Sequence, residues 1–260
     1  SLFYTEMIVA QAIHYSKNRN KLLDFDEIEH PIAIQLGGDN PKLLAEAAQI
    51  AEDWGYDEIN LNIGCPSPKV KSGNFGACLM GRPKIVANCI EKMKKSCNIP
   101  ITVKHRLGID NLDNDEYLMQ FVDNCSIAGA DRFIVHARKA WLNGLNPKEN
   151  RTIPPLQYER VEKLKKNRPE LIIELNGGIN TMDDCIKTLK VFDGAMIGRA
   201  AYSRPFMWTK IDSMIFGQKE EHFSRSKIII KTIPFAQKHL ENDGRLWHIA
   251  KHILNLIENI

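Results

Sequence analysis

The chain has 260 residues, of which 43% are hydrophobic and 26% charged, an ordinary balance for a globular protein with a large core. No apolar run approaches the roughly 18 residues of a membrane span and no basic-then-apolar leader is visible, so we expect a cytoplasmic protein without a membrane partner. The six cysteines form neither a CxxC pair nor a zinc-spaced cluster, which favours reduced thiols and no metal, and a net charge of +3 is too small to indicate a nucleic-acid partner by itself.

Short apolar runs typical of buried strands alternate with amphipathic helical segments. The predicted strands start near residues 3, 32, 59, 101, 132, 171 and 194. The helices between them carry start and stop signals: Asn40-Pro41 opens one that Gly55 ends, Arg82-Pro83 opens another, and Thr181 caps the one that follows. This order predicts parallel strands joined by helical crossovers.

Polar residues recur at the C-terminal ends of the predicted strands, namely Gln35, Asn62, Lys104, His136 and Asn176. Because active sites of (β/α)8 barrels are built at that end, the pattern favours an α/β fold of the TIM-barrel type over an open doubly wound sheet. Seven strands are visible, and the chain begins almost inside one of them. We therefore expect that the first strand of the barrel is missing from this sequence.

The rhythm of strands and helices ends after Trp208. Residues 224–240, with a kink expected at Pro234, and 245–260 read as helices only. We predict a barrel domain over residues 1–215 and a small all-helical domain over residues 216–260.

Cys65 follows the strand 58–63 and a turn at Gly64, and a connection of roughly twenty residues then leads to Pro83. Structureless connections of this length are uncommon in compact domains unless they are functional, which predicts a lid beside a catalytic group. A thiol with an ordinary pKa of about 8.5 is mostly protonated at neutral pH and suits proton donation. The alternative is a small apolar residue at a turn, the role we expect for the other five cysteines.

Two glycine-containing strand ends, Asn176-Gly177-Gly178 and Gly198-Arg199, resemble the phosphate site that the last loops of barrels often form. The alternative is a pair of tight turns between strand and helix. The glycines do not follow a GxGxxG pattern, so a Rossmann site is not indicated.

Lys104 interrupts an otherwise apolar strand, and such a buried ammonium needs a partner, either a structural ion pair or a cofactor. His136 and Arg138 end the next strand at the same edge, although a lone histidine is often structural. His105 and Arg106 are expected to face the outer layer.

A basic segment between two predicted elements contains Arg138, Lys139, Trp141, Lys148, Asn150 and Arg151, with Lys69 and Lys71 on the Cys65 connection. Basic side chains with an interleaved aromatic can bind the phosphates of a polyanion, although charge runs are often only solvated surface.

Taken together, these residues resemble the tRNA-dihydrouridine synthases, most closely the DusA subfamily, over nearly the whole chain. The motifs that carry the resemblance are Tyr4–Met7, Gln35–Gly38, Asn60–Ser67, Gly76–Met80, Val103–Arg106, Val135–Arg138, Asn146–Arg151, Asn176–Gly178 and Gly198–Arg199.

The resemblance implies an FMN-binding barrel followed by a helical tRNA-binding domain, acting as a monomer. FMN phosphate would bind at Asn176, Gly177, Gly178, Gly198 and Arg199, and the flavin ring at Gln35, Lys104 and His136. NADPH would reduce FMN, whose N5 hydride would pass to C6 of a tRNA uracil while Cys65 protonates C5. Asn62 would orient the uracil, and the tRNA would contact Arg138, Lys139, Lys148, Asn150 and Arg151. By the same analogy the substrate would be the D-loop uridines 20 and 20a.

Three other interpretations stay open. One is an FMN-dependent dehydrogenase of free pyrimidines, which the helical tail and the basic segment disfavour. A second is a tRNA-binding protein or folding chaperone whose effect does not need Cys65. A third is a metabolic barrel enzyme that uses the phosphate site alone.

Overall fold

The computed structural model describes residues 1–257, and the last three residues of the predicted C-terminal helix lie outside that range. Contacts within the chain divide it into two compact units. The sheet unit comprises Leu2–Gly177 and Val191–Met196. The helical unit comprises Ser1, Gly178–Lys190 and residues 197–257. The expected domain boundary between residues 215 and 216 stays a prediction.

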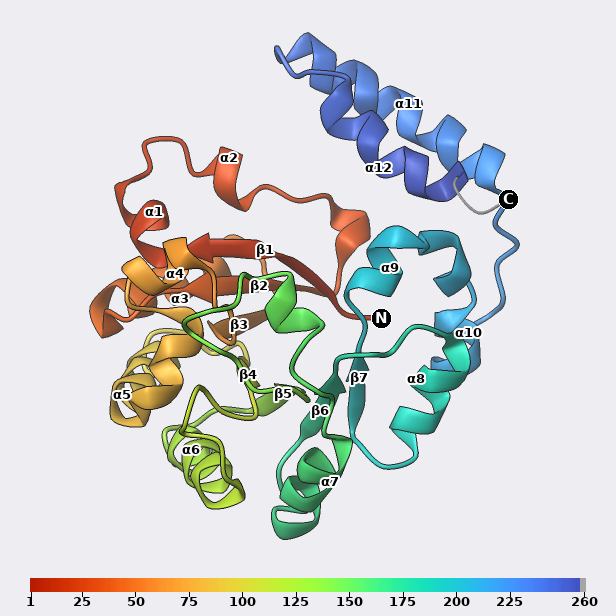
Figure 1. Ribbon diagram of the computed structural model, residues 1–260. Coiled ribbons are helices and arrows are strands. Elements are labelled where there is room, and N and C mark those ends of the chain that lie inside the picture. The colour runs from red at the N-terminus through yellow and green to blue at the C-terminus, as the bar shows by residue number, and fades with distance from the viewer. Residues whose placement is uncertain (258–260) are drawn as a thin grey trace. The chain divides into compact units, whose positions relative to one another are not determined.

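The sheet unit is built on seven parallel strands that pair in chain order and curl as in a TIM barrel (Figure 1). The strands are β1 (Phe3–Val9), β2 (Ile32–Gly37), β3 (Glu58–Ile63), β4 (Ile101–Arg106), β5 (Arg132–His136), β6 (Ile173–Asn176) and β7 (Gly194–Met196). The predicted TIM-barrel-type α/β fold and all seven strands are confirmed. The sixth strand begins at Ile173, slightly later than expected.

Helices connect consecutive strands and pack on the outside of the curl (Figure 1). They are α1 (Ala10–Tyr15), α2 (Asn20–Leu23), α3 (Pro41–Asp53), α4 (Pro68–Ser72), α5 (Pro83–Lys94), α6 (Asp115–Ile127) and α7 (Tyr158–Asn167). The predicted start signal of α3 is confirmed, since the Asn40 side chain accepts from the N–H of Lys42 at 3.0 Å.

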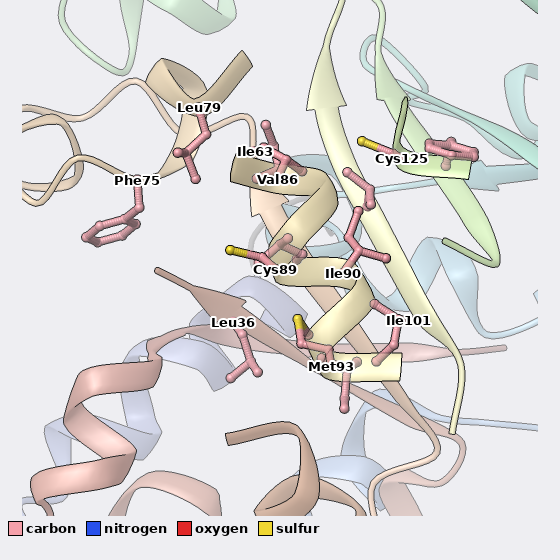
Figure 2. Close-up of a cluster of buried hydrophobic side chains, with 14 of the residues drawn as sticks. Leu36, Ile63, Phe75, Leu79, Val86, Cys89, Ile90, Met93, Ile101 and Cys125 are labelled. Atoms are coloured by element: carbon pink, nitrogen blue, oxygen red, sulfur yellow. The ribbon is translucent and has the colours of Figure 1, made fainter. Parts of the chain in front are cut away.

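The main core lies between the strands and these helices. Figure 2 shows side chains of α5 directed at side chains of the strands, and those labelled there include Val86, Ile90, Met93, Leu36, Ile63 and Ile101. All six are without solvent exposure. Because strand side chains alternate between faces, the residues between these apolar ones lie on the inner face of the curled sheet. On β3 and β4 those inner-face residues are polar: Glu58, Asn60, Asn62, Thr102, Lys104 and Arg106.

The connection from Cys65 to Pro83 contradicts the expectation of a structureless loop. It contains α4 and a 3-10 helix, η2 (Gly76–Gly81). The Ser67 hydroxyl caps α4 by accepting from the N–H of Val70 at 3.3 Å, and Pro68 fits its first turn. Pro68 therefore belongs to a helix start, and Gly76, with its positive φ, to a tight turn.

The helical unit holds no strand among its described residues. Its elements are α8 (Met182–Leu189), α9 (Arg199–Ser203), a 3-10 helix η4 (Pro205–Trp208), α10 (Ile211–Phe216), α11 (Arg225–Glu241) and α12 (Trp247–Ile257). The predicted cap of α8 at Thr181 is confirmed, and the Ser224 side chain caps α11. Helices α11 and α12 contact each other, and α12 also contacts α9 and η4. Within residues 1–257, no helix is both long and apolar enough to span a membrane.

Candidate active site

Cys65 occupies a turn that the end of β3 holds in place. The side-chain oxygen of Asn62 accepts from the backbone N–H of Gly64 at 3.1 Å and of Cys65 at 3.0 Å. The carbonyl of Cys65 accepts from the N–H of Ala77 at 2.9 Å, which joins the turn to η2. These bonds fix the backbone of Cys65, and the residue itself is half-buried.

Gly76 allows η2 to approach this turn. Its φ of +68° is one that glycine adopts easily, and a Cβ there would lie 2.6 Å from the carbonyl oxygen of Cys65 and collide with Val70. The close packing of the connection on Cys65 therefore depends on a glycine at this position.

Lys104 is the nearest strand neighbour of Asn62, because β3 and β4 pair Asn62 with Lys104. Its ammonium donates to the side-chain oxygen of Asn176 at 3.0 Å, and none of the ion pairs found within residues 1–257 includes it. Burial, and secondarily the positive charge of Arg106, lowers the pKa of Lys104 to about 8. An ammonium whose protein partner is a neutral amide can also donate a hydrogen bond to an electron-rich ligand.

Arg106 lies on the inner face beside the Cys65 turn, so the expectation that it faces the outer layer is wrong. Its Nε donates to the carbonyl of Gly64 at 3.2 Å, and Nη1 donates to the carbonyl of Asn150 at 2.9 Å. Alternation along β4 places Arg106 on the same face as Lys104, a signal present in the sequence. His105, between them, packs against Phe121 and Phe133 on the outer side, as expected.

Positive charge concentrates around Cys65. Burial is the main reason that the pKa of Arg106 falls to about 10, with smaller contributions in the same direction from the charges of Arg138 and Arg151 and an opposing one from a negative charge on Cys65. A negative charge on Cys65 also raises the pKa of Lys104. Of these cations, Arg106 contacts the turn directly through its bond to the carbonyl of Gly64, and Lys104 precedes it on the same face of β4.

Asn150 has a different position from the one expected of a tRNA contact. The side chain has no exposed surface, and its amide bonds only to the main chain of its own loop: the oxygen accepts from the N–H of Trp141 at 2.8 Å, and the nitrogen donates to the carbonyl of Trp141 at 2.9 Å. A buried side chain cannot touch an external polyanion. Asn150 instead stabilises the loop over residues 137–157, which we call the basic loop.

The cations of the basic loop divide into two groups. Lys139 is half-buried, pairs with Asp113 at 3.2 Å and lies 4.0 Å from the ring centre of Trp141. Arg138 is also half-buried and donates to the carbonyl of Pro154. Lys148 and Arg151 are exposed, so they are the members of the loop best placed to meet a large anion.

Gln35 and His136, the other expected contacts of the flavin ring, also lie on strands of the sheet unit. The Gln35 amide oxygen accepts from Asn62 at 2.7 Å. His136 is buried and sits against Gly177, where an added Cβ would lie 2.5 Å from the imidazole Cδ2. Gly177, with φ of +106°, thus makes room for the histidine.

The remaining expected phosphate ligands, Gly178, Gly198 and Arg199, belong to the helical unit. Gly178 has a φ of +76°, and its carbonyl accepts from the Asn180 side chain at 2.8 Å. A Cβ added at Gly198, just before α9, would meet nothing within 4 Å. Phosphate binding at these residues stays a prediction. No group of three or more potential metal ligands occurs among the described residues 1–257.

Sequence reasoning missed a polar network on the inner face, which involves Tyr4, Glu58, Asn60, Thr102, Arg132 and Glu174. Polar residues at every second position of β3 and β4 were the available signal.

Comparison with known proteins identifies the family to which this sequence is similar. The model of the dihydrouridine synthase (Dus) family matches residues 1–260. A tRNA-dihydrouridine(20/20a) synthase of Synechocystis sp. is 53% identical over 256 residues, which cover 98% of this chain and 76% of that protein. A protein of the same name from Shewanella oneidensis is 46% identical over 260 residues, covering 100% of this chain and 77% of its own length.

Among solved structures, a 2-naphthoyl-CoA reductase complex matches with a TM-score of 0.51 at 16% identity. The match covers 67% of this chain and 29% of the other. At this identity the likeness concerns the fold alone.

Proposed function

The chain belongs to the dihydrouridine synthase (Dus) family, and we propose that it is a tRNA-dihydrouridine(20/20a) synthase, which reduces the C5=C6 bond of uridines 20 and 20a in tRNA. The observation that carries the proposal is the Cys65 thiol, fixed on its turn beside the cations Lys104 and Arg106. The relatives named above support the choice of substrate.

The residues of the sheet unit fit FMN as the cofactor. The half-buried Lys104 ammonium, whose one hydrogen-bond partner within residues 1–257 is the Asn176 amide, can contact the oxygens and nitrogens of a flavin ring. Gln35, His136, Asn176 and Gly177 are the other proposed FMN contacts of this unit, and Gly178, Gly198 and Arg199 stay predicted phosphate ligands of the helical unit. When bound, FMN would supply a hydride for C6 of the uracil, with NADPH as its proposed reductant.

Cys65 acts as the general acid. Hydride addition to C6 leaves negative charge at C5, and the thiol of Cys65 donates its proton there. The thiolate that remains lies on the turn whose Gly64 carbonyl accepts from the guanidinium of Arg106 at 3.2 Å. Asn62 is proposed to orient the uracil through its amide nitrogen. The amide oxygen accepts from the Cys65 turn, and one of the two N–H groups donates to Gln35, which leaves the second N–H for the uracil.

The tRNA is bound through its phosphates. Lys148 and Arg151 on the basic loop are exposed, and Arg151 and Arg138 add positive potential next to Arg106. Because the target base must leave its stack to reach the thiol, these contacts offset part of the cost of extrusion. The monomeric state, the cytoplasmic location and the absence of a metal stay predictions.

A spectrum tests this proposal. The purified protein is loaded with FMN, reduced with NADPH without oxygen, and then mixed with unmodified tRNA or with free uracil. We expect the flavin absorbance to bleach with NADPH and to return only with tRNA. Return of the flavin absorbance with free uracil but not with tRNA would assign the protein to dehydrogenases of free pyrimidines. Failure to retain FMN would contradict the proposed flavin-dependent reduction.

A further inference from the structure

A continuous row of hydrogen bonds crosses the inner face of the sheet and ends at the Cys65 turn. It starts at Glu58, which accepts from the Thr102 hydroxyl at 2.6 Å. Thr102 accepts from the Asn60 amide at 2.9 Å, and Asn60 in turn accepts from Gln35 at 2.9 Å. Gln35 accepts from Asn62 at 2.7 Å. We call these five side chains the amide row.

The direction of every bond in the amide row is fixed from its Glu58 end. The Thr102 proton can go only to the Glu58 carboxylate or to the carbonyl of Ile59 at 3.3 Å, and neither group donates. Thr102 must therefore accept from Asn60, which forces the Asn60 oxygen towards Gln35. The same reasoning turns the Gln35 oxygen towards Asn62.

Glu58 is held as an acceptor by two further donors. Arg132 pairs with one of its oxygens and also with Glu174 at 3.1 Å. The Tyr4 oxygen accepts from Arg132 at 3.2 Å, which leaves the Tyr4 proton for Glu58 at 3.4 Å. Glu58 lies at the start of β3 and Asn62 near its end, so the row connects the two ends of the strand.

The consequence appears at Asn62. An amide can rotate by half a turn and exchange its oxygen and nitrogen at little steric cost. Only with its nitrogen towards Gln35 does Asn62 present its oxygen to the N–H groups of Gly64 and Cys65. The reversed amide would place N–H groups against N–H groups and release the turn.

We propose that the amide row is a positioning device for Cys65: Glu58, Thr102, Asn60 and Gln35 orient the Asn62 amide, and Asn62 fixes the turn that presents the thiol. Thr102 and Asn60 touch neither substrate nor cofactor in this assignment. The proposal rests on the proposed function for its catalytic meaning, whereas the placement of the thiol can be measured without turnover.

Thr102→Val removes the hydroxyl at nearly constant shape and tests the proposal in the full chain. The first readout is the rate at which iodoacetamide modifies Cys65, measured by peptide mass spectrometry from pH 6 to 9 (about the range in which thiols titrate). Cys78, half-buried in the same connection, is the internal reference. We expect the ratio of Cys65 to Cys78 modification to change by about fivefold, the factor of one ordinary hydrogen bond.

The second readout is turnover. Thr102→Val is expected to lower kcat by about fivefold or more with the KM for tRNA unchanged, and Thr102→Ser, which keeps the hydroxyl, to restore it. Thr188→Val makes the same change at a buried helix position of the other unit, where the hydroxyl bonds to the carbonyl of Asp184 at 2.8 Å. It is expected to change neither readout.

A double variant tests the route through Asn62. In an Asn62→Ala background, Thr102→Val should have no further effect on Cys65 modification, because the bond that it acts through is gone. The proposal would be overturned if the effects of Asn62→Ala and Thr102→Val on Cys65 modification multiplied independently. It would also be overturned if Thr102→Ser failed to restore the rate, or if Thr188→Val had the same effect as Thr102→Val. If Thr102→Val does not fold, Asn60→Ala breaks the row one bond nearer to Asn62 and is read in the same way. A wild-type protein that makes no dihydrouridine would overturn the proposed function and leave the modification result standing.

Discussion

Cys65 gains its proposed role from neighbours that are distant in the sequence. A thiol becomes a useful acid when its conjugate base is stabilised without being exposed to bulk water. Arg106 is a buried cation beside the turn, and Lys104, half-buried, lies on the same face of β4. The carbonyl of Gly64 links Arg106 to the turn itself, so one guanidinium both orients the backbone and supplies charge.

His105 predicts an acid sensitivity of the folded state. Burial lowers the pKa of His105 to about 4, with a smaller effect of Lys104 in the same direction, whereas the hydrogen bond to the Arg106 carbonyl opposes the shift. Between about pH 6.5 and pH 4 the unfolded chain therefore binds a proton that the folded chain does not. Stability falls as the pH falls through this window, by up to about 3 kcal/mol from this group.

Urea unfolding at several pH values between 7.5 and 4.5 (roughly the window of that shift) checks the effect. His105→Leu is expected to be less stable than the wild type at neutral pH, because it loses the bond at 2.7 Å to the Arg106 carbonyl, and to lose less stability on acidification. Parallel loss in both proteins would show that other groups cause the acid sensitivity.

The connection between β3 and α5 is the element on which the site depends most. Its helices α4 and η2 pack around Cys65, and Gly76 is the point of closest approach. Gly76→Ala is expected to cost at least about 2 kcal/mol of stability, because a positive φ and a collision with the Cys65 carbonyl act together. The modification rate of Cys65 should change as well.

Gly144→Ala is the matched control for that prediction. Gly144 also has a positive φ, +82°, but an added Cβ would meet nothing within 4 Å. We expect a cost of about 1 kcal/mol from the backbone alone. Equal urea midpoints for the two variants would contradict the role assigned to the contact between η2 and the turn.

The strands were predictable because each is a local apolar run with clear turn signals at its ends. The edge at which Asn62, Lys104 and His136 meet was also predictable, since parallel strands bring their C-terminal ends together. Arg106 was misplaced although its alternation with Lys104 along β4 was visible. The burial of Asn150 was not predictable in this way, because it depends on the path of the loop back to Trp141.

At the scale of the whole molecule, the distribution of charge matters more than its total. The sequence has 35 basic and 32 acidic residues, so its net charge alone gives little attraction to a polyanion. The exposed cations of the basic loop are expected to provide it. Lys148→Ala combined with Arg151→Ala should weaken tRNA binding and reduce the slope of log affinity against log salt by about one per charge removed.

Filter binding or fluorescence titration at several salt concentrations measures both quantities. Lys92→Ala, at the last turn of α5, removes one positive charge away from the basic loop and should leave the affinity almost unchanged. An equal loss of affinity per charge removed, in Lys92→Ala and in the Lys148→Ala, Arg151→Ala variant, would show that binding follows net charge and not the basic loop.

The central claim is that Cys65 donates the proton that completes reduction of a tRNA uridine. The most direct test incubates FMN-loaded wild type, Cys65→Ala and Cys78→Ala with NADPH and unmodified tRNA, and follows dihydrouridine at positions 20 and 20a by nucleoside mass spectrometry. We predict full conversion by the wild type and the Cys78 variant, and a rate lower by about 100-fold or more for Cys65→Ala with tRNA binding retained. Conversion by Cys65→Ala at the wild-type rate would contradict the account.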